Sequence, residues 1–191
     1  MKTGKITSIN LKSRTIFTIV LLLGFTSGIF FSSFVNMPSL KKNLLGTKKV
    51  AQIGIIVKDI ETASASYASL LGVEKPEIVM AENPADNPTT YKGKLSNGSC
   101  KLAFFNLDNM QLELIEPVGE PSTWKEYLDE TGGGIHHIGF WIKDMDKKLK
   151  DLEILGIKEV QHGGWTGGQY CYAEAPDDMG IILELLENFN E

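Results

Sequence analysis

The chain repeats one pattern twice, and this internal repeat limits its fold more than any other feature of the sequence. The first copy opens with QIGIIVKD from Gln52, and the second opens with HIGFWIKD from His137, 85 positions later. The copies also close alike, with QLELIE around Glu113 and ILELLE around Glu184, 71 positions apart. This self-similarity predicts two modules of the same architecture within one chain.

Each copy predicts the order strand, helix, strand, strand, strand. In the first copy, the alternating β-branched residues of 50–57 predict a strand, and a helix is expected between Asp59 and Gly72. The other expected strands are 77–80, 99–106 and 110–116 in the first copy and 135–142, 158–162, 169–174 and 180–186 in the second, with a helix at 144–155. The expected fold class is α+β, with tandem βαβββ modules at 50–117 and 135–187.

Three segments between these elements are expected to be loops or connectors. The Asn- and Pro-rich loop 82–98 accounts for most of the change in spacing from 85 to 71, since insertions belong in loops. The connector 118–134 predicts a short capped helix through Leu128, followed by three glycines. The glycine-rich stretch 162–168 is expected to be either a mobile flap with Trp165 as an apolar cover or an ordinary flexible connection.

The first 37 residues differ in composition from the rest of the chain. They contain four basic residues and no acidic residue, and the segment 15–35 is uncharged and rich in Ile, Leu, Val and Phe. This pattern predicts an apolar helix in 1–37 that serves as a signal peptide or membrane anchor, followed by a linker at 38–49. We therefore expect a protein that is anchored to the cell membrane or exported, with its folded part outside the cytoplasm.

Composition argues against a nucleic-acid-binding protein and against a disulfide-rich protein. Without the four basic charges of the first 37 residues, the formal net charge of −5 becomes −9, whereas phosphate binding requires a basic face. Nucleic acid is therefore not an expected partner. The two cysteines, Cys100 and Cys171, are too few for a disulfide framework. They lie in corresponding regions of the two copies, so a pair between them stays open, and otherwise they are expected to behave as small apolar residues.

Four side chains of the kinds that bind metals occupy corresponding strand positions in the two copies: Gln52, Glu113, His137 and Glu184. Because side chains alternate across a strand, these four converge if the two sheets wrap together. One imidazole, two carboxylates and one amide oxygen suit a divalent ion such as zinc, nickel, cobalt, manganese or iron. Such a site leaves coordination positions open for water or a substrate oxygen.

Taken singly, each of these residues is more often structural. A strand glutamate is usually solvated, a lone histidine such as His137 usually has a structural partner, and Gln52 would commonly only form a hydrogen bond. Their symmetric placement is what predicts a metal site. His136 is expected on the opposite face of its strand and is not a candidate ligand, whereas Trp141 shares the face of His137 and lines either the cavity or the core.

Residues 50–187 resemble the vicinal oxygen chelate superfamily, which includes glyoxalase I, methylmalonyl-CoA epimerase, extradiol dioxygenases and bleomycin-resistance proteins. The segments that carry the resemblance are QIGIIVKD at 52–59, GGIHHIGF at 133–140, and PDDMG at 176–180 leading into LEL. The His-His opening is most similar to the epimerase branch. The Gln, Glu, His, Glu set is similar to that of some glyoxalase I enzymes, and many members have histidine where this chain has Gln52.

The resemblance implies an open, cup-shaped mixed sheet around a divalent metal ion bound by Gln52, Glu113, His137 and Glu184. It also implies removal of a proton next to a carbonyl group, with Glu184 as the general base. The implied substrate is a small 2-oxo, 2-hydroxy or thioester compound. Because coenzyme A thioesters are mainly cytoplasmic, either the folded part faces the cytoplasm behind an anchor or the substrate is another compound of this kind. Members of the family often dimerise, so a homodimer is a further expectation.

Three functions remain open at this point. The first is a metal-dependent isomerase, epimerase or lyase, and the second is a non-catalytic protein that binds an aromatic or drug-like molecule. The third is an iron-dependent dioxygenase, which the sequence disfavours because oxygen-activating iron typically has two histidine ligands and only His137 is well placed. Binding proteins of this fold usually lack ligand-type residues at all four positions, which disfavours the second.

Overall fold

The computed structural model of this protein describes residues 43–190 of the 191-residue chain. The strands are β1 Gln52–Ile56, β2 Val79–Met80, β3 Thr90–Tyr91, β4 Lys94–Leu95, β5 Ser99–Asn106, β6 Gln111–Val118, β7 Gly134–Trp141, β8 Lys158–Trp165, β9 Gly168–Glu174 and β10 Ile182–Asn188. The helices are α1 Ile60–Leu71, α2 Thr123–Thr131 and α3 Met145–Leu152, with single 3-10 turns η1 Glu153–Leu155 and η2 Asp177–Met179. The expected α+β class is confirmed for this part of the chain.

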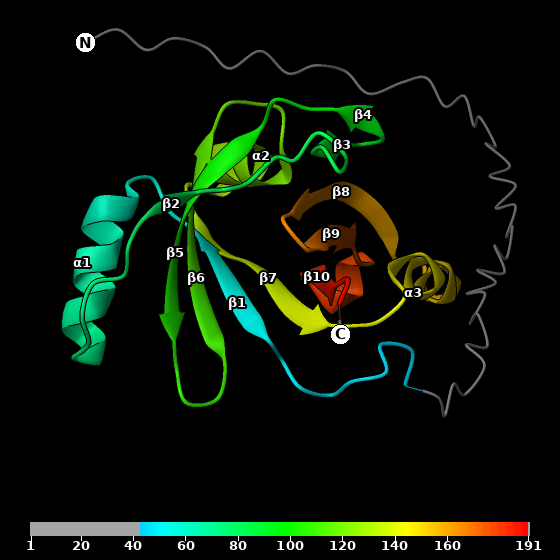
Figure 1. Cartoon of the computed structure of the whole chain (residues 1–191), viewed down its shortest axis with the longest axis horizontal. Helices are drawn as coiled ribbons and strands as arrows, with labels where there is room; N and C mark the ends of the chain where they lie inside the picture. Colours follow the sequence, from blue (N-terminus) through cyan, green and yellow to red (C-terminus); the bar gives the residue numbers. More distant parts are fainter. Residues whose placement is uncertain (1–42, 191) are drawn as a thin grey trace, which may run out of the picture. The chain divides into compact units, whose positions relative to one another are not determined.

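The ten strands form one mixed sheet in the order β2-β5-β6-β1-β7-β10-β9-β8-β3-β4. At its centre, the first strands of the two copies pair with each other in antiparallel orientation. Each first strand also pairs in parallel with the last strand of its own copy, β1 with β6 and β7 with β10. The sheet curls, with α1 outside β5 and β6 and α3 beside β8 to β10 (Figure 1). This symmetry places corresponding residues of the two copies on four adjacent central strands.

The repeated Lys-Asp pair at the end of each opening strand starts a helix. The side chain of Asp59 accepts a hydrogen bond from the backbone N–H of Thr62 at the start of α1, and Asp144 does the same for Lys147 at the start of α3. These caps satisfy backbone donors that have no partner within the helix. Gly72 ends α1 with a φ of 67°, a conformation that glycine adopts without steric cost.

The two flanking helices cover separate apolar clusters on the outer side of the sheet. Helix α1 packs Ile60 and Ala68 against residues of β5 and β6. Helix α3 packs Met145 and Leu152 against a cluster that includes Cys171 on β9. Because these clusters lie under the helices, the opposite face of the central strands remains available for a site.

Two segments expected to be loops contain strands. The loop 82–98 includes β3 and β4, and β3 pairs with β8 through Thr90 and His162. The glycine-rich stretch 162–168 belongs to the β8–β9 hairpin, in which Trp165 pairs with Gly168. Long-range pairing stabilises these strands although glycine, proline and asparagine have low β propensity. Helix α2 also extends to Thr131, beyond the expected end at Leu128.

The expected apolar helix in 1–37 and most of the linker at 38–49 lie outside the described residues. None of the helices within 43–190 combines the length and the apolar character that a membrane span requires.

Candidate metal centre

The four central strands bring together all four candidate ligands named from the sequence. Gly54 on β1 pairs with Glu113 on one side and with His137 on the other. Gly139 on β7 pairs in the same way with Glu184 and with Gln52. Each module therefore contributes one glutamate and one residue of its first strand, arranged around two glycines that correspond in the repeat.

Three ligand atoms converge in the interior of this site. The Nε2 atom of His137 lies 3.4 Å from Oε2 of Glu113 and 3.2 Å from Oε2 of Glu184. The exposed fractions of these residues are 0% for His137, 5% for Glu113 and 3% for Glu184. Neither Nε2 of His137 nor Oε2 of Glu184 forms a hydrogen bond. Buried polar atoms without partners are costly, so their convergence marks a place where a cation fits.

The donor set agrees with a divalent metal ion. One imidazole nitrogen and two carboxylate oxygens, all within 4.8 Å of one another, are ligands that zinc and related ions accept in proteins. Gln52 lies beside this group, and its Nε2 donates a hydrogen bond of 2.8 Å to Oε2 of Glu113. In this arrangement Gln52 orients a candidate ligand, as partners of metal-binding carboxylates commonly do.

The electrostatics of the site depend on the two carboxylates. Burial raises the pKa of Glu113 above its ordinary value. Burial also disfavours a charged imidazole at His137, but the negative charges of Glu184 and Glu113 outweigh it and raise the pKa of His137 to about 10. The carboxylates thus attract positive charge to the point that faces His137 Nε2, either as a proton or as a metal ion.

His136 lies closer to the site than the sequence predicted. The pairing of β1 with β7 shifts register after His137, because Gly54 pairs with His137 and Ile55 with Ile135. His136 is therefore the extra residue of a bulge, and such a bulge can redirect a side chain. Its Nδ1 lies 3.1 Å from Nδ1 of His137. Simple alternation along a regular strand could not reveal this contact.

The hydrogen bond between the two histidines orients His137. Burial, and then the charge of His137, lower the pKa of His136 to about 3, so its ring is neutral. A neutral His136 can accept a hydrogen bond from Nδ1–H of His137. The remaining nitrogen of His137, Nε2, then faces Glu113 and Glu184 as a potential ligand, an arrangement typical of metal-binding histidines.

The site opens into a cavity of about 330 Å³ whose walls are mainly apolar and aromatic. Gln52, Glu113 and Glu184 supply polar groups to its lining, and Tyr172, buried beside His137, lines it as well. Trp141 on β7 and Trp165 on β8 form an edge-to-face pair with ring centroids 6.2 Å apart. Of the two positions expected for Trp141, the cavity lining and the core, the structure shows the cavity lining. A cavity with few polar groups among apolar walls is typical of small-molecule sites.

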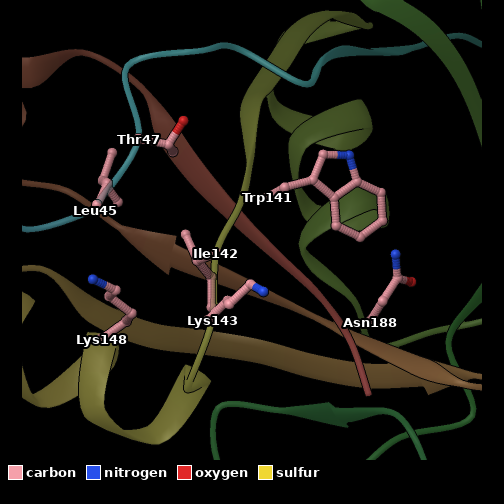
Figure 2. Close-up of a pocket in the computed structure, with 8 residues that line it drawn as sticks. Leu45, Thr47, Trp141, Ile142, Lys143, Lys148 and Asn188 are labelled. Atoms are coloured by element: carbon pink, nitrogen blue, oxygen red, sulfur yellow. The ribbon is translucent and has the colours of Figure 1, made fainter. Parts of the chain in front are cut away.

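A second cavity, of about 380 Å³, lies beside the end of β7 (Figure 2). Leu45 and Thr47 from the segment before β1, Lys143, and Lys148 of α3 contribute to its lining. Lys148 donates a hydrogen bond of 2.9 Å to the backbone oxygen of Leu44, so it anchors this segment. Three of the four candidate ligands, Gln52, Glu113 and Glu184, line the first cavity, which is therefore the candidate functional site.

The chain belongs to the Glyoxalase/Bleomycin resistance protein/Dioxygenase superfamily, because the model of that family matches residues 51–172. The resemblance to the vicinal oxygen chelate superfamily is confirmed by this match. It includes the first copy of the repeat and the second copy as far as Tyr172 in β9, and it ends before β10.

Two curated relatives of this chain are named as methylmalonyl-CoA epimerases. The chain is 28% identical over 142 residues to the ethylmalonyl-CoA/methylmalonyl-CoA epimerase of Cereibacter sphaeroides, with 72% of this chain and 96% of the relative covered. It is 26% identical over 141 residues to the mitochondrial methylmalonyl-CoA epimerase of Homo sapiens, with 72% of each chain covered.

Solved structures share the fold at lower identity. The crystal structure of methylmalonyl-CoA epimerase from Mycobacterium tuberculosis is 22% identical, with a TM-score of 0.54 and coverage of 80% of this chain and 94% of that chain. A methylmalonyl-CoA epimerase in complex with methylmalonyl-CoA and NH4+ is 21% identical, with a TM-score of 0.53 and coverage of 74% and 95%. At these identities the likeness extends to the fold alone.

Proposed function

We propose that this member of the superfamily is a divalent-metal-dependent epimerase that removes a proton from a carbon next to a carbonyl group. The observation that carries the proposal is the convergence of His137 Nε2, Glu113 Oε2 and Glu184 Oε2 beside a cavity that the two glutamates line. The relatives named as methylmalonyl-CoA epimerases support the isomerase branch. They give no support to the glyoxalase I-like lyase that the resemblance also suggested.

In this proposal His137, Glu113 and Glu184 bind the metal ion, and Gln52 either joins them or orients Glu113. The ion would be zinc, nickel, cobalt or manganese, all of which accept nitrogen and oxygen ligands. When bound, such an ion polarises the substrate carbonyl and stabilises the negative charge that develops on its oxygen. This assignment is supported by Nε2 of His137 and Oε2 of Glu184, two buried atoms that form no hydrogen bond.

Glu184 is the proposed general base. Its carboxylate lines the cavity, and its Oε2 has no hydrogen-bond partner that would hold it away from a substrate. It would take the proton from the carbon next to the carbonyl, leaving an enolate. Glu113 lies on β6, on the other side of the two first strands, and is proposed to return a proton to the opposite face of that carbon. Such a return inverts the configuration and restores the substrate formula.

The cavity suggests which part of the substrate it encloses. Gln52, Glu113 and Glu184 supply polar groups to its lining, and its walls also contain Phe104, Trp141 and Trp165. We propose that the reacting carbonyl binds next to these polar groups and that an apolar part of the substrate contacts the aromatic walls. Because relatives are named for methylmalonyl-CoA, that thioester is the first substrate to test.

The test follows proton exchange rather than product formation alone. The purified full chain, stripped of metal and reloaded with cobalt or zinc, is incubated with methylmalonyl-CoA in D2O, and loss of the signal of the exchangeable proton is followed by NMR. We expect metal-dependent exchange that falls at least 100-fold in Glu184→Gln, because removing a positioned base typically costs about 10²–10⁴-fold. The matched control is Glu74→Gln, which changes an exposed glutamate in the loop after α1.

The metal content of the same samples distinguishes a protein that binds no metal ion from one that binds the ion but does not catalyse proton exchange. A chain that takes up no divalent ion overturns the proposal. A chain that binds the ion and an aromatic ligand, but exchanges no proton in any 2-oxo, 2-hydroxy or thioester compound, favours the alternative of a non-catalytic binding protein. The aromatic walls of the cavity are the observation in favour of that alternative.

We also propose that the protein is exported or anchored to the membrane through residues 15–35. The support is the uncharged apolar composition of that segment behind four basic residues. Fractionation of cells that express the full chain, with antibody against residues 43–190, tests this proposal. Recovery of the full-length chain from the cytoplasmic fraction alone would contradict it.

A further inference from the structure

A second group of metal-ligand side chains lies on the outer face of the sheet, away from the cavity. It consists of Glu159 and His162 on β8 and Cys171 on β9, whose ligand atoms lie within 4.8 Å of one another. Cys171 belongs to the apolar cluster beneath α3, whereas its neighbour Tyr172 lines the cavity on the other face. The group is therefore separate from the candidate metal centre.

A bulge in β8 brings the three side chains onto one face. His162 pairs with Cys171 and Glu159 pairs with Ala173, and the register shifts between Glu159 and Gln161. In a regular strand, residues three positions apart point to opposite faces. The extra residue of the bulge cancels one alternation, so Glu159 and His162 share the outer face with Cys171.

A chain of hydrogen bonds fixes the orientation of His162. Glu187 accepts bonds from the backbone N–H groups of Asp144 and Met145 at the start of α3. The Nε2 atom of Gln169 donates to Glu187 at 2.8 Å, which leaves the amide oxygen of Gln169 facing His162. That oxygen lies 3.1 Å from Nε2 of His162 and can only accept, so Nε2 must carry the hydrogen.

The other ring nitrogen of His162 faces the remaining members of the group. Its Nδ1 lies 3.5 Å from Oε2 of Glu159, and Sγ of Cys171 lies 3.7 Å from the same oxygen. A histidine that donates one N–H to a carbonyl oxygen and turns its other nitrogen toward a carboxylate and a sulfur has the arrangement of a zinc ligand. In a tetrahedral zinc site with bonds of about 2.0–2.3 Å, ligand atoms lie roughly 3.3–3.6 Å apart.

From this geometry we propose that Glu159, His162 and Cys171 form a second divalent-metal site of the zinc class. Three protein ligands of the nitrogen, oxygen and sulfur types leave the fourth position for water. Access runs past Glu159, whose side chain is 39% exposed, while Cys171 is fully buried. Because the ligands come from both strands of the β8–β9 hairpin, the ion would join these two strands on the outer face of the sheet.

Without a metal ion, the same atoms form an ordinary local contact. His162 then takes a proton at Nδ1 and pairs with Glu159, and the thiol of Cys171 donates to that carboxylate. Burial raises the pKa of this thiol, so it stays protonated until a metal ion replaces its proton. The proposal therefore requires loss of the Cys171 proton on metal binding, a change that spectroscopy can detect.

The experiment uses cobalt(II) as the probe on the full chain. A thiolate bound to cobalt gives a near-ultraviolet charge-transfer band, whereas the candidate ligands of the cavity site contain no sulfur. We expect the band in the wild-type chain and its loss in Cys171→Ser. The matched control Cys100→Ser, which changes the buried cysteine that lines the cavity, should keep the band.

A second variant tests the orientation of His162 without removing a ligand. Gln169→Ala should weaken cobalt binding at this site by about 10–100-fold, as loss of such a partner typically does. Far-ultraviolet circular dichroism confirms that each variant folds. Absence of the band in the wild type, its survival in Cys171→Ser, or its loss in Cys100→Ser would each overturn the proposal. The result is independent of the cavity site, because Glu113→Gln and Glu184→Gln should leave the band unchanged.

Discussion

The imidazole of His137 occupies the space that a side chain at Gly54 would need. A Cβ atom built on Gly54 would lie 2.0 Å from Cε1 of His137, far inside van der Waals contact. Gly139 has the corresponding role in the second copy, where a Cβ would lie 2.7 Å from Cγ of Gln52 and from Oε2 of Glu184. The two repeated glycines are therefore part of the candidate site. Because they have no Cβ, they leave room for the side chains that form the site.

Gly54→Ala should displace His137 and weaken metal binding. The methyl group would collide with a ring that is completely buried, so the free energy of unfolding should fall by about 1–3 kcal/mol, the usual cost of overpacking. Metal content by elemental analysis and urea unfolding measure the two effects. Gly139→Ala is the companion variant and should act on Gln52 and Glu184 instead. Unchanged metal content in Gly54→Ala would contradict the close packing of His137 against Gly54.

Gln52→Leu should destabilise the metal-free protein. The variant keeps the approximate size of the side chain but removes the N–H that donates to Glu113. An unsatisfied buried acceptor costs about 1–3 kcal/mol, which urea unfolding in the presence of a chelator can measure. Metal affinity should also fall, because Glu113 loses the group that orients it. An equally stable variant with unchanged affinity would show that Gln52 has neither role.

Glu184→Gln should destabilise the metal-free protein and reduce the stabilisation that a metal ion gives. Oε2 of Glu184 lies 3.2 Å from Nε2 of His137, and the charge of Glu184 helps to raise the pKa of His137. The variant therefore loses a buried ion pair, and we expect its free energy of unfolding to fall by about 3 kcal/mol without metal. Metal at 100 times its dissociation constant should add about 2.7 kcal/mol to the wild type and much less to the variant. Thermal unfolding with and without chelator measures both. A variant that gains as much stability from the metal ion as the wild type does would show that Glu184 is not a ligand.

Trp141→Ala should affect substrate binding rather than the chemical step. Trp141 lines the cavity and contacts Trp165, but it is not among the candidate ligands. We expect KM to rise about tenfold with kcat nearly unchanged, because uniform binding of ground state and transition state is lost. Steady-state kinetics on the substrate found by proton exchange tests this expectation. Equal loss of kcat would place Trp141 closer to the reacting atoms than the cavity geometry indicates.

Glu126→Gln should reduce the loss of stability in acid. Hydrogen bonds from Tyr91 and Lys92 lower the pKa of Glu126 from its ordinary value of 4.5. A carboxylate with a lowered folded-state pKa contributes stability above the unfolded value and loses it as the pH falls through the folded value. The variant should therefore show a weaker pH dependence of unfolding between about pH 5 and pH 3. Glu130→Gln, an exposed neighbour on α2, is the control and should behave like the wild type.

Much of the fold and the membership of the candidate site follow from the repeat. Alternation along β1 and β7 was enough to predict that Gln52 and His137 share a face, and the matching closing strands predicted that Glu113 and Glu184 join them. The geometry on the four central strands brings these residues together as expected. Their roles as metal ligands and base stay predictions.

Other features depend on contacts that no local pattern contains. Strands β3 and β4 form in an Asn- and Pro-rich segment because β3 pairs with β8, more than 60 residues away. His136 lies beside His137 because a bulge interrupts alternation, and the sequence has no signal for its position. The orientation of Gln52 toward Glu113 likewise appears only when both strands are in register.

The two ends of the sheet limit how this protein can assemble. The outermost strands, β2 and β4, are each two residues long, so an incoming strand would find few backbone groups with which to pair. Short edge strands of this kind protect a large sheet against edge-to-edge aggregation. Another copy of the chain, or any other partner, would therefore gain little by adding a strand to β2 or β4.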